Sequence, residues 1–423
     1  MFLKAKEENE ILLGFPWVFG NEIDYVKSAS KDGSSSKSQK AHASLENCAL
    51  EDGSLVEVFS QGGAFLGSGV LNKKSKIAVR LLGNARADFI GNNAEEFFAD
   101  KIQAAYDLRK LSFDESDSYR LVFGEADFIP GLIVDRFKDV NGNVYLVIQF
   151  LSLSCEVFRS EILQALRAIV HPFGIYERSD AAVRNLEGLD ERSGWQGDEK
   201  EEVITIRENG VLLEVDLARG QKTGYFLDQK RNREKVACLA KGKRRVLDAF
   251  CHTASFALNA VKGGAQEVIA AELSSYACRA AERNVALNKA EDKISVIQAD
   301  AFDALRKFEE EVEAAGDECR FDMIILDPPA FTKNAKNIDK AYGGYKEINM
   351  RAMRLLKAGG ILVSCSCSAF FDGERFYGML MKAASDANRK VQVIEKSGAA
   401  PDHPILLGYS KSEYLKCAVC RVL

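Results

Sequence analysis

From residue 244 to residue 366, short apolar runs alternate with longer segments that carry apolar residues at helical spacing. The strand-like runs are RRVLDAF, EVIAAEL, ISVIQAD, FDMIILD and ILVSCS, and the helix-like segments are SFALNAVKG, SYACRAAERNVALN, AFDALRKFEEE and KEINMRAMRLLKAGG. This alternation is typical of the βαβ units that build a doubly wound sheet. We therefore predict an α/β, Rossmann-like domain over residues 236–423.

A chain of 423 residues exceeds the size of a usual single core, so further domains are expected. Residues 1–85 hold short β-like runs separated by glycines, which indicates a small β-barrel. Within it, the polar, Ser-rich stretch around residues 28–50 predicts a flexible loop. Residues 86–235 begin with a helical pattern and continue with hairpin-like apolar runs, so we predict a linker helix and an α+β middle domain.

Cysteine usage and hydropathy together point to a cytoplasmic protein. Ten cysteines are scattered without a repeating framework, and several lie inside apolar strand-like runs, which suits a reducing compartment. Cys417 and Cys420 form one Cys-x-x-Cys without a second pair or a nearby His, so we expect no metal site. No apolar run is long enough to span a membrane, and the first residues lack a signal-peptide pattern.

Acidic side chains close four successive predicted strands. They are Asp248, Glu272, Asp300 and Asp327. Ligands of open α/β sheets bind outside the carboxyl ends of the strands, so we expect these carboxylates to line one site. Each acid alone could instead cap a helix, because Asp and Glu favour the first turn.

The turn after the first of these strands reads DAFCHTASFA and lacks the Gly-x-Gly-x-x-Gly fingerprint of a pyrophosphate site. NAD and FAD are therefore disfavoured, whereas S-adenosylmethionine, which has no phosphate, remains compatible. We expect Glu272 to bind ribose hydroxyls and Asp300 to meet the adenine edge. The residues of the turn expected to bind this cofactor are Asp248, Phe250, Cys251 and Thr253.

Two thiols, Cys365 and Cys367, close the fifth predicted strand, beside the one that ends in Asp327, Pro328 and Pro329. A thiolate can add to an electron-poor pyrimidine carbon while a carboxylate polarises a ring nitrogen. The combination favours covalent attack on a pyrimidine. The alternative is structural, because buried cysteines commonly behave as small apolar residues.

The net charge is −5, yet positive charge is concentrated between Arg219 and Arg245, where ten Lys or Arg stand against two acids. A solvated helix face is the plain interpretation of such a run. Because the run directly precedes the predicted catalytic domain, contacts with nucleic-acid phosphates are the competing interpretation.

The motifs in combination resemble a known family. The segments that carry the resemblance are GFPWVFGNEI, FIPGLIVDRF, TGYFLDQKRNR, LDAFCHTASFA, DPPAFTK, YKEINM, PDHPILLGY and EYLKCAVCRVL. They resemble the RlmI-like bacterial ribosomal RNA large-subunit cytosine-C5 methyltransferases, which carry an N-terminal PUA domain. The resemblance implies a class I methyltransferase sheet, S-adenosylmethionine as methyl donor and large-subunit ribosomal RNA as substrate, and it leaves a homodimer open.

The resemblance also implies residue roles. The nucleophile of the family falls on Cys367, and Asp327 would hydrogen-bond the cytosine near N3. Asp327 and Gln229 also join the cofactor-binding residues. No residue is assigned as the base that removes the C5 proton. The residues expected to contact RNA are Phe331, Lys230, Arg231 and Arg233.

Aromatic side chains could hold a base that has left its stack. Phe331, just after the two prolines, is the first candidate, and Tyr342 and Tyr345 are further ones, with core packing as the alternative for all three.

Two rival functions remain compatible with these residues. An exocyclic-amine methyltransferase could use the Asp-Pro-Pro-aromatic loop for direct transfer without a thiol, so the role of Cys367 discriminates. A noncatalytic RNA-binding protein would keep the barrel and the basic run but need neither the four acids nor the thiol.

Overall fold

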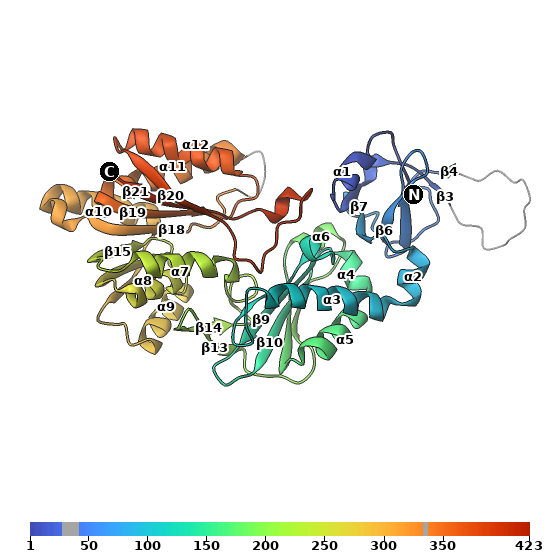
Figure 1. Cartoon of the computed structure of the whole chain (residues 1–423), viewed down its shortest axis with the longest axis horizontal. Helices are drawn as coiled ribbons and strands as arrows, with labels where there is room; N and C mark the ends of the chain where they lie inside the picture. Colours follow the sequence, from blue (N-terminus) through green and yellow to red (C-terminus); the bar gives the residue numbers. More distant parts are fainter. Residues whose placement is uncertain (28–41, 333–336) are drawn as a thin grey trace, which may run out of the picture. The chain divides into compact units, whose positions relative to one another are not determined.

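The computed structural model describes residues 1–27, 42–332 and 337–423, which form two compact units (Figure 1). Unit one comprises the described parts of residues 1–202, 216–225 and 401–412. Unit two comprises the described parts of residues 203–215, 226–400 and 413–423. Most of the Ser-rich stretch, residues 28–41, lies outside the described residues, so the predicted flexible loop cannot be compared with the structure there.

The N-terminal part of unit one is a seven-stranded sheet of order β2-β7-β6-β5-β1-β3-β4. Strand β5 alternates buried and half-exposed positions, and its Val56 and Val58 face the core. The elements are β1 (Phe2–Leu3), α1 (Glu8–Leu12), β2 (Trp17–Phe19), β3 (Ile23–Lys27), β4 (His42–Ala43), β5 (Leu55–Phe59), β6 (Phe65–Leu71) and β7 (Ile77–Gly83). The β-rich N-terminal domain expected from the sequence is present.

The second part of unit one is a five-stranded sheet of order β12-β11-β10-β9-β8. Strands β8, β9 and β10 form an antiparallel meander, which confirms the hairpin pattern of the sequence. Helices α3 and α5 share one apolar core with these strands. The elements are α2 (Ala87–Asn92), α3 (Ala94–Lys110), β8 (Tyr119–Phe123), β9 (Leu132–Lys138), β10 (Val144–Phe150), α4 (Leu153–Val157), α5 (Arg159–Val170), β11 (Gly174–Ser179), α6 (Val183–Leu186) and β12 (Arg192–Trp195).

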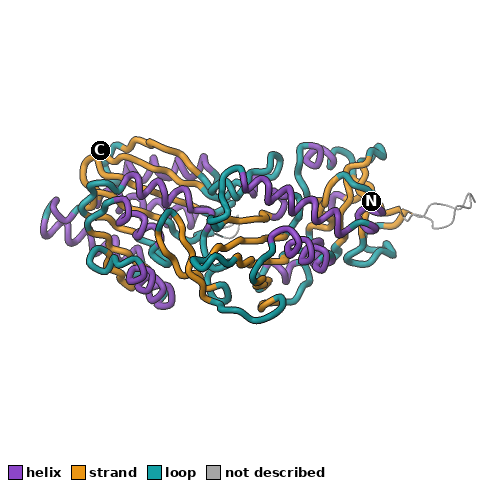
Figure 2. Tube along the Cα trace, turned by 60° about the horizontal axis from the view of Figure 1, so that its bottom comes forward, coloured by secondary structure: helices purple, strands orange, loops and turns teal. Residues whose placement is uncertain are grey.

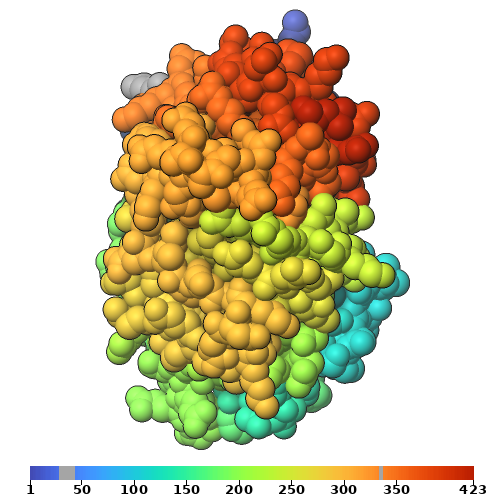
Figure 3. Space-filling model, turned by 90° about the vertical axis from the view of Figure 1, so that its left-hand side faces the viewer, coloured from blue at the N-terminus to red at the C-terminus, as the bar shows by residue number. Residues whose placement is uncertain are grey.

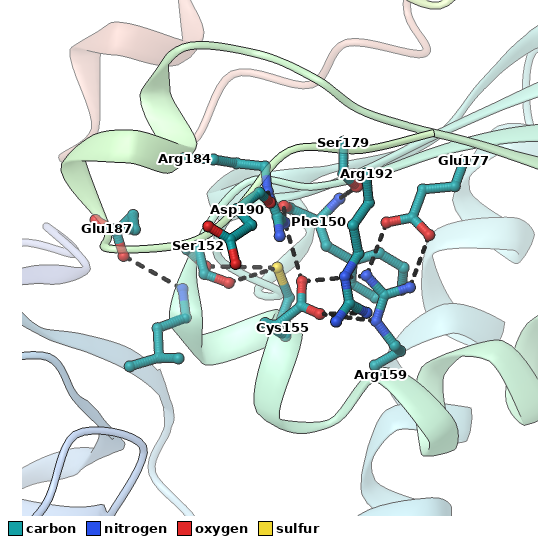
Figure 4. Close-up of polar contacts among 12 residues, drawn as sticks. Phe150, Ser152, Cys155, Arg159, Glu177, Ser179, Arg184, Glu187, Asp190 and Arg192 are labelled. Atoms are coloured by element: carbon teal, nitrogen blue, oxygen red, sulfur yellow. Dashed lines mark hydrogen bonds and ion pairs between the residues drawn. The ribbon is translucent and has the colours of Figure 1, made fainter. Parts of the chain in front are cut away.

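A cluster of paired charges joins α4, α5, α6 and β11 (Figure 4). Arg159 donates to Glu177 and Glu156, with nitrogen–oxygen distances of 2.7 Å and 2.8 Å. The guanidinium of Arg184 is buried and contacts Glu156 at 2.9 Å. Because Arg159 and Arg184 both pair with carboxylates of the same cluster, we interpret it as internal architecture rather than as a ligand site.

Unit two is built on a seven-stranded sheet of order β17-β16-β15-β18-β19-β21-β20. The first five strands are parallel, and β21 is antiparallel to both of its neighbours. Strand β18, FDMIIL, is almost wholly buried, as expected for the centre of a parallel sheet. The strands are β15 (Arg245–Asp248), β16 (Glu267–Glu272), β17 (Ile294–Gln298), β18 (Phe321–Leu326), β19 (Leu356–Ser366), β20 (Val391–Ser397) and β21 (Lys416–Val422). This confirms the predicted Rossmann-like α/β domain.

Helices flank these strands (Figure 2), and residues of unit two cover much of the face of the molecule drawn in Figure 3. Helices α10, α11 and α12 share a core with β18 and β19, while α7 packs on α8. The chain reverses its winding between β15 and β18, and such switch points are where open α/β sheets bind ligands. The helices are α7 (Lys230–Leu239), α8 (Ser255–Gly263), α9 (Ser275–Leu287), α10 (Ala301–Ala315), α11 (Ile338–Leu355) and α12 (Gly373–Asp386).

The hairpin of β13 (Val203–Glu208) and β14 (Val211–Asp216) belongs to unit two, except for Asp216. Asn284 of α9 and Asn288, directly after that helix, accept hydrogen bonds from the β14 backbone, at 2.7 Å and 2.9 Å. Arg233 of α7 forms a bidentate ion pair with Glu208, at 2.5 Å and 3.0 Å. The boundary expected at residues 235/236 therefore falls inside α7, because tertiary pairing and not local pattern decides where the hairpin and this helix pack.

Among the described residues, no helix is both long and apolar enough to cross a membrane.

The Arg233–Glu208 pair gives a stability prediction. Both side chains are 1% exposed, so Glu208→Gln leaves a buried guanidinium without its counter-charge. We expect a loss of about 3 kcal/mol in the free energy of unfolding. Denaturant titration of the full chain, monitored by far-UV circular dichroism, measures this free energy.

The matched control is Glu234→Gln, which breaks the exposed pair of Arg231 and Glu234 and should change stability by less than about 0.5 kcal/mol. The double variant Glu208→Leu, Arg233→Met should recover much of the loss. Equal effects of the Glu208 and Glu234 variants would contradict the structural role of the buried pair.

Candidate active site

The four predicted acids lie at the carboxyl ends of β15, β16, β17 and β18, which are neighbours in one parallel sheet. Asp248 and Glu272 are the last residues of their strands, whereas Asp300 and Asp327 follow theirs by two residues and one residue. The structure thus brings together, at one edge of the sheet, residues that are 79 positions apart in the chain.

Asp248 is fully buried, and its Oδ2 accepts a hydrogen bond of 3.1 Å from the amide of Ala257 in α8. Its Oδ1 makes no well-formed hydrogen bond with the described residues. Burial, followed by the nearby charge of Asp327, raises the pKa of Asp248 to about 8. The site therefore holds a carboxyl group that a cationic ligand would ionise.

The turn between β15 and α8 is held in an unusual backbone conformation, with positive φ at His252 (49°) and Ala254 (65°). Thr253 lies between them, and its buried Oγ1 has no hydrogen-bond partner among the described residues. Cys251 is 3% exposed, and burial raises the pKa of its thiol well above the usual range. Phe250 is half-buried against the core of the unit.

Glu272 is oriented by backbone amides. Its Oε2 accepts from His252 at 3.0 Å and its Oε1 from Ser274 at 2.8 Å. Each oxygen keeps a lone pair, so the carboxylate can accept a pair of neighbouring hydroxyls. Asp300 is the N-cap of α10 and accepts from the amide of Phe302 at 2.8 Å. The capping alternative for Asp300 is therefore present in the structure, and its contact with adenine stays a prediction.

Gln229 lies at the start of α7 and donates from Nε2 to Oδ1 of Asp327, at 2.8 Å. Its own oxygen accepts from Asn232 at 2.6 Å. Gln229 is 3% exposed. Gln229 is therefore buried against Asp327 and orients its carboxylate.

The two thiols differ in environment. Cys365 is 1% exposed and lies within β19, opposite Cys417 of β21. Its hydrogen bond with Cys417, together with burial, raises its pKa well above the usual range. Cys367 follows the end of β19 and is partly exposed, with its Sγ 4.0 Å from the carbonyl oxygen of Pro328. Because the thiolate is the nucleophile, this geometry favours Cys367 over Cys365.

The three aromatic candidates also differ in how deeply they are buried. Phe331 is half-buried, with its ring 4.5 Å from Tyr345 and 5.9 Å from Phe302. Tyr345 is completely buried and stacks on Phe371 at 5.0 Å, so its ring serves core packing. Tyr342 is partly buried and contacts Phe371 edge-on.

The structure argues against most of the phosphate contacts predicted for the basic run. Arg233 is buried in its pair with Glu208, and Lys230 is 7% exposed. Lys243 and Arg244 precede β15 and Arg245 is its first residue, so all three lie at the end of the sheet opposite the acids. Arg231, an exposed residue paired with Glu234, retains an accessible charge.

Lys416 was not singled out from the sequence. Its side chain is 8% exposed, and burial lowers its pKa to about 8. The signal that could have found it is a lysine inside the apolar strand pattern EYLKCAVC, where a charge is costly.

Known proteins match both parts of the chain. Residues 160–408 match the family described as S-adenosylmethionine-dependent methyltransferase, and residues 1–84 match the PUA-like domain. The ribosomal RNA large subunit methyltransferase I of Tolumonas auensis is 37% identical over 428 residues, covering 100% of this chain and 99% of that protein. The protein of the same name from Photobacterium profundum is 35% identical over 426 residues, with coverage of 100% and 99%. The chain belongs to the ribosomal RNA large subunit methyltransferase I family.

Solved structures of family-like proteins agree with this fold over the full length. A putative SAM-dependent methyltransferase from Streptococcus mutans has a TM-score of 0.77 at 22% identity, covering 100% of this chain and 99% of that one. A putative methyltransferase complexed with SAH has a TM-score of 0.78 at 22% identity, with the same coverage. The N-terminal sheet is therefore PUA-like, and the protein is an S-adenosylmethionine-dependent methyltransferase.

The residues of the candidate site fit this cofactor. S-adenosylmethionine carries positive charge on its sulfonium and its ammonium group, and the buried carboxyl of Asp248 gains from a nearby cation. The buried Oγ1 of Thr253 and the backbone-held carboxylate of Glu272 offer polar partners to a ligand with hydroxyl and amino groups.

Asp248 generates a pH prediction. Because its folded pKa of about 8 lies above the usual 3.8, the stability that it contributes is complete below about pH 3.8 and is lost as the pH rises through 8. A cation beside it reverses this loss. S-adenosylmethionine should therefore raise the melting temperature of the wild-type protein more at pH 9 than at pH 6.

In Asp248→Asn the ligand-induced shift should depend less on pH, while titration of the ligand's own amine is common to both proteins. Asp303→Asn, an exposed residue in the first turn of α10, is the control and should behave like wild type. An equal pH dependence in wild type and Asp248→Asn would contradict the raised pKa.

Proposed function

We propose that this protein methylates C5 of a cytosine in large-subunit ribosomal RNA through a covalent adduct between Cys367 and C6. The observation that carries the proposal is the position of the Cys367 sulfur, 4.0 Å from the Pro328 carbonyl and therefore beside Asp327 at the sheet edge. The names of the full-length relatives support the ribosomal RNA substrate, and the PUA-like domain supports RNA binding. The predicted cytoplasmic location agrees with such a substrate.

The thiol must act because C5 of cytosine is a poor nucleophile. The Cys367 thiolate forms a bond to C6, and the electrons of the C5–C6 double bond move to C5 and into the ring. Bound S-adenosylmethionine supplies an electrophilic methyl group. Removal of the C5 proton then restores the double bond as the sulfur–carbon bond breaks, which returns the thiolate.

Asp327 stabilises the adduct in this proposal by hydrogen bonding near N3 of the cytosine. Its orientation is fixed by Gln229, which is itself held by Asn232. Gln229 thus orients Asp327 in this proposal, and its direct contact with the cofactor stays a prediction.

The remaining roles follow the geometry of the cofactor turn. Asp248 would face the positive charge of the cofactor, Glu272 the ribose hydroxyls, and Asp300 the adenine edge beside its capping bonds. Phe250, Cys251 and Thr253 would shape the wall of this pocket.

The target cytosine would leave its stack to reach Cys367, as in other base-modifying enzymes. Phe331 is the aromatic ring that we propose to contact it, since Tyr345 is closed off by Phe331 and Phe371. Arg231 is the residue of the basic run that we retain as a phosphate contact.

The thiol variants give the decisive test. Cys367→Ala should lower methyl transfer at least 1,000-fold, on the order of 4 kcal/mol, because no adduct forms. Affinity for S-adenosylmethionine, measured by calorimetry, should be unchanged. Cys365→Ala is the matched control, and it should keep activity within about tenfold because its thiol is buried and held protonated.

RNA with 5-fluorocytidine at the target should become covalently trapped, because fluorine does not leave as the proton does. Peptide mass spectrometry should place the adduct on Cys367. Full activity of Cys367→Ala would refute the proposal and favour methylation of an exocyclic amine by the Asp-Pro-Pro-Phe loop. An adduct on Cys365 would keep the reaction and reverse the assignment of the thiols.

A further inference from the structure

Lys416 lies on β21 across from the end of β19, at the point where the chain enters the candidate active site. It pairs in register with Ser366, the residue before Cys367. Its Nζ donates to the carbonyl oxygen of Ser368 at 2.6 Å and to that of Tyr414 at 2.7 Å. One buried amine therefore ties the residue just after the proposed nucleophile to the strand beside it.

The two carbonyls accept from two N–H groups of Lys416, so one position on Nζ is still open for another partner. In the neutral amine that position is a lone pair, and in the ammonium it is a third N–H. Burial lowers the pKa of Lys416 to about 8, so both forms are accessible near neutral pH. The nitrogen can thus accept a proton or donate one without breaking its contacts.

The charged and titratable groups that face Lys416 are Cys367, Asp372 and Glu413. Asp372 is engaged as the N-cap of α12, where it accepts from the amide of Arg375 at 2.8 Å. Glu413 is exposed to solvent. Cys367 is the group whose neighbouring carbonyl Lys416 holds, so the thiol is the partner that the geometry singles out.

We propose that Lys416 is a positioning residue for the Cys367 nucleophile, holding the turn at Ser368 and taking up the proton that the thiol releases. The inference rests on the proposed role of Cys367. The S–H bond breaks, its electron pair stays on sulfur, and an N–H bond forms on Lys416, so the step yields a thiolate beside an ammonium. It needs no further reactant.

A carboxylate near Cys367 acts in the opposite direction. Burial raises the pKa of Tyr345 to about 12, and Cys367 and Asp327 both lie close enough to its hydroxyl to add to this rise. The tyrosine stays neutral, so the opposing charge is that of Asp327. A carboxylate disfavours a neighbouring thiolate, since like charges repel. The positive charge of Lys416, brought in from β21, offsets that repulsion.

The test is the pH dependence of alkylation of Cys367 by iodoacetamide, mapped by peptide mass spectrometry on the full chain without RNA. Cys238 is exposed and serves as the internal reference thiol. Lys416→Gln keeps a hydrogen-bond donor for the Ser368 carbonyl but removes the positive charge and the proton-accepting amine. Lys416→Met removes the donor, the charge and the amine. Lys382→Gln on α12, which loses an exposed pair with Asp386, is the matched control.

In wild type and in Lys382→Gln, Cys367 should react at lower pH than Cys238. In Lys416→Gln and Lys416→Met its midpoint should rise by about one pH unit, which is a tenfold slower reaction at pH 7. The Cys238 profile and the affinity for S-adenosylmethionine should stay constant, which shows that the variants fold. An unchanged Cys367 midpoint in both Lys416 variants would overturn the proposal.

This measurement is separate from the test of the covalent mechanism. Alkylation reports the state of the thiol without turnover, whereas trapping with 5-fluorocytidine reports whether the thiol attacks the base. A shifted midpoint with no trapped adduct would support the pairing of Lys416 with Cys367 and refute the role of that thiol in methyl transfer.

Discussion

Crowding of carboxylates at the carboxyl ends of β15 and β18 is the constraint on which the candidate site depends. Asp248 is fully buried, and the charge of Asp327 adds to the cost of ionising it. Such a pair is stabilised by a retained proton or by a cationic ligand. A dinucleotide would bring phosphate charge to the same edge and increase the repulsion. The electrostatics of the site and the absence of a glycine-rich phosphate loop in the printed sequence therefore favour the same cofactor, which carries positive charge and no phosphate.

The end of β19 separates two thiols that the sequence presents as a pair. Residues two apart in a strand point to the same face, so continued pairing would give Cys365 and Cys367 one environment. The ladder to β21 instead ends at Ser366 and Lys416. Cys365 stays inside the sheet opposite Cys417, and Cys367 leaves it toward the Pro328 carbonyl. The chemical difference between the thiols is thus a consequence of where one strand stops.

The sequence predicted what local periodicity and turn chemistry control. The alternation of strands and helices, the acids at strand ends and the meander of β8 to β10 follow from patterns within some thirty residues. Glu208 and Arg233 both lie in the predicted middle domain but belong to unit two in the structure, and neither side chain shows in its own neighbourhood that it will be buried. The same holds for residues 401–412, which belong to unit one although both flanking segments belong to unit two. Long-range packing of this kind has no local signal.

The basic run between Arg219 and Arg245 shows that local sequence does not separate a charge that faces solvent from one that is paired inside the protein. A cluster of Lys and Arg suggests a phosphate surface, but a guanidinium also makes several directed hydrogen bonds inside a protein. Arg233 uses them on Glu208 and the Phe226 carbonyl, and so fixes the first turn of α7. Gln229, directly before that turn, orients Asp327. Arg233, which was expected to bind RNA, instead holds the start of α7, next to the residue that orients Asp327. Its effect on the substrate would therefore act through the position of the Asp327 carboxylate and not through a phosphate contact.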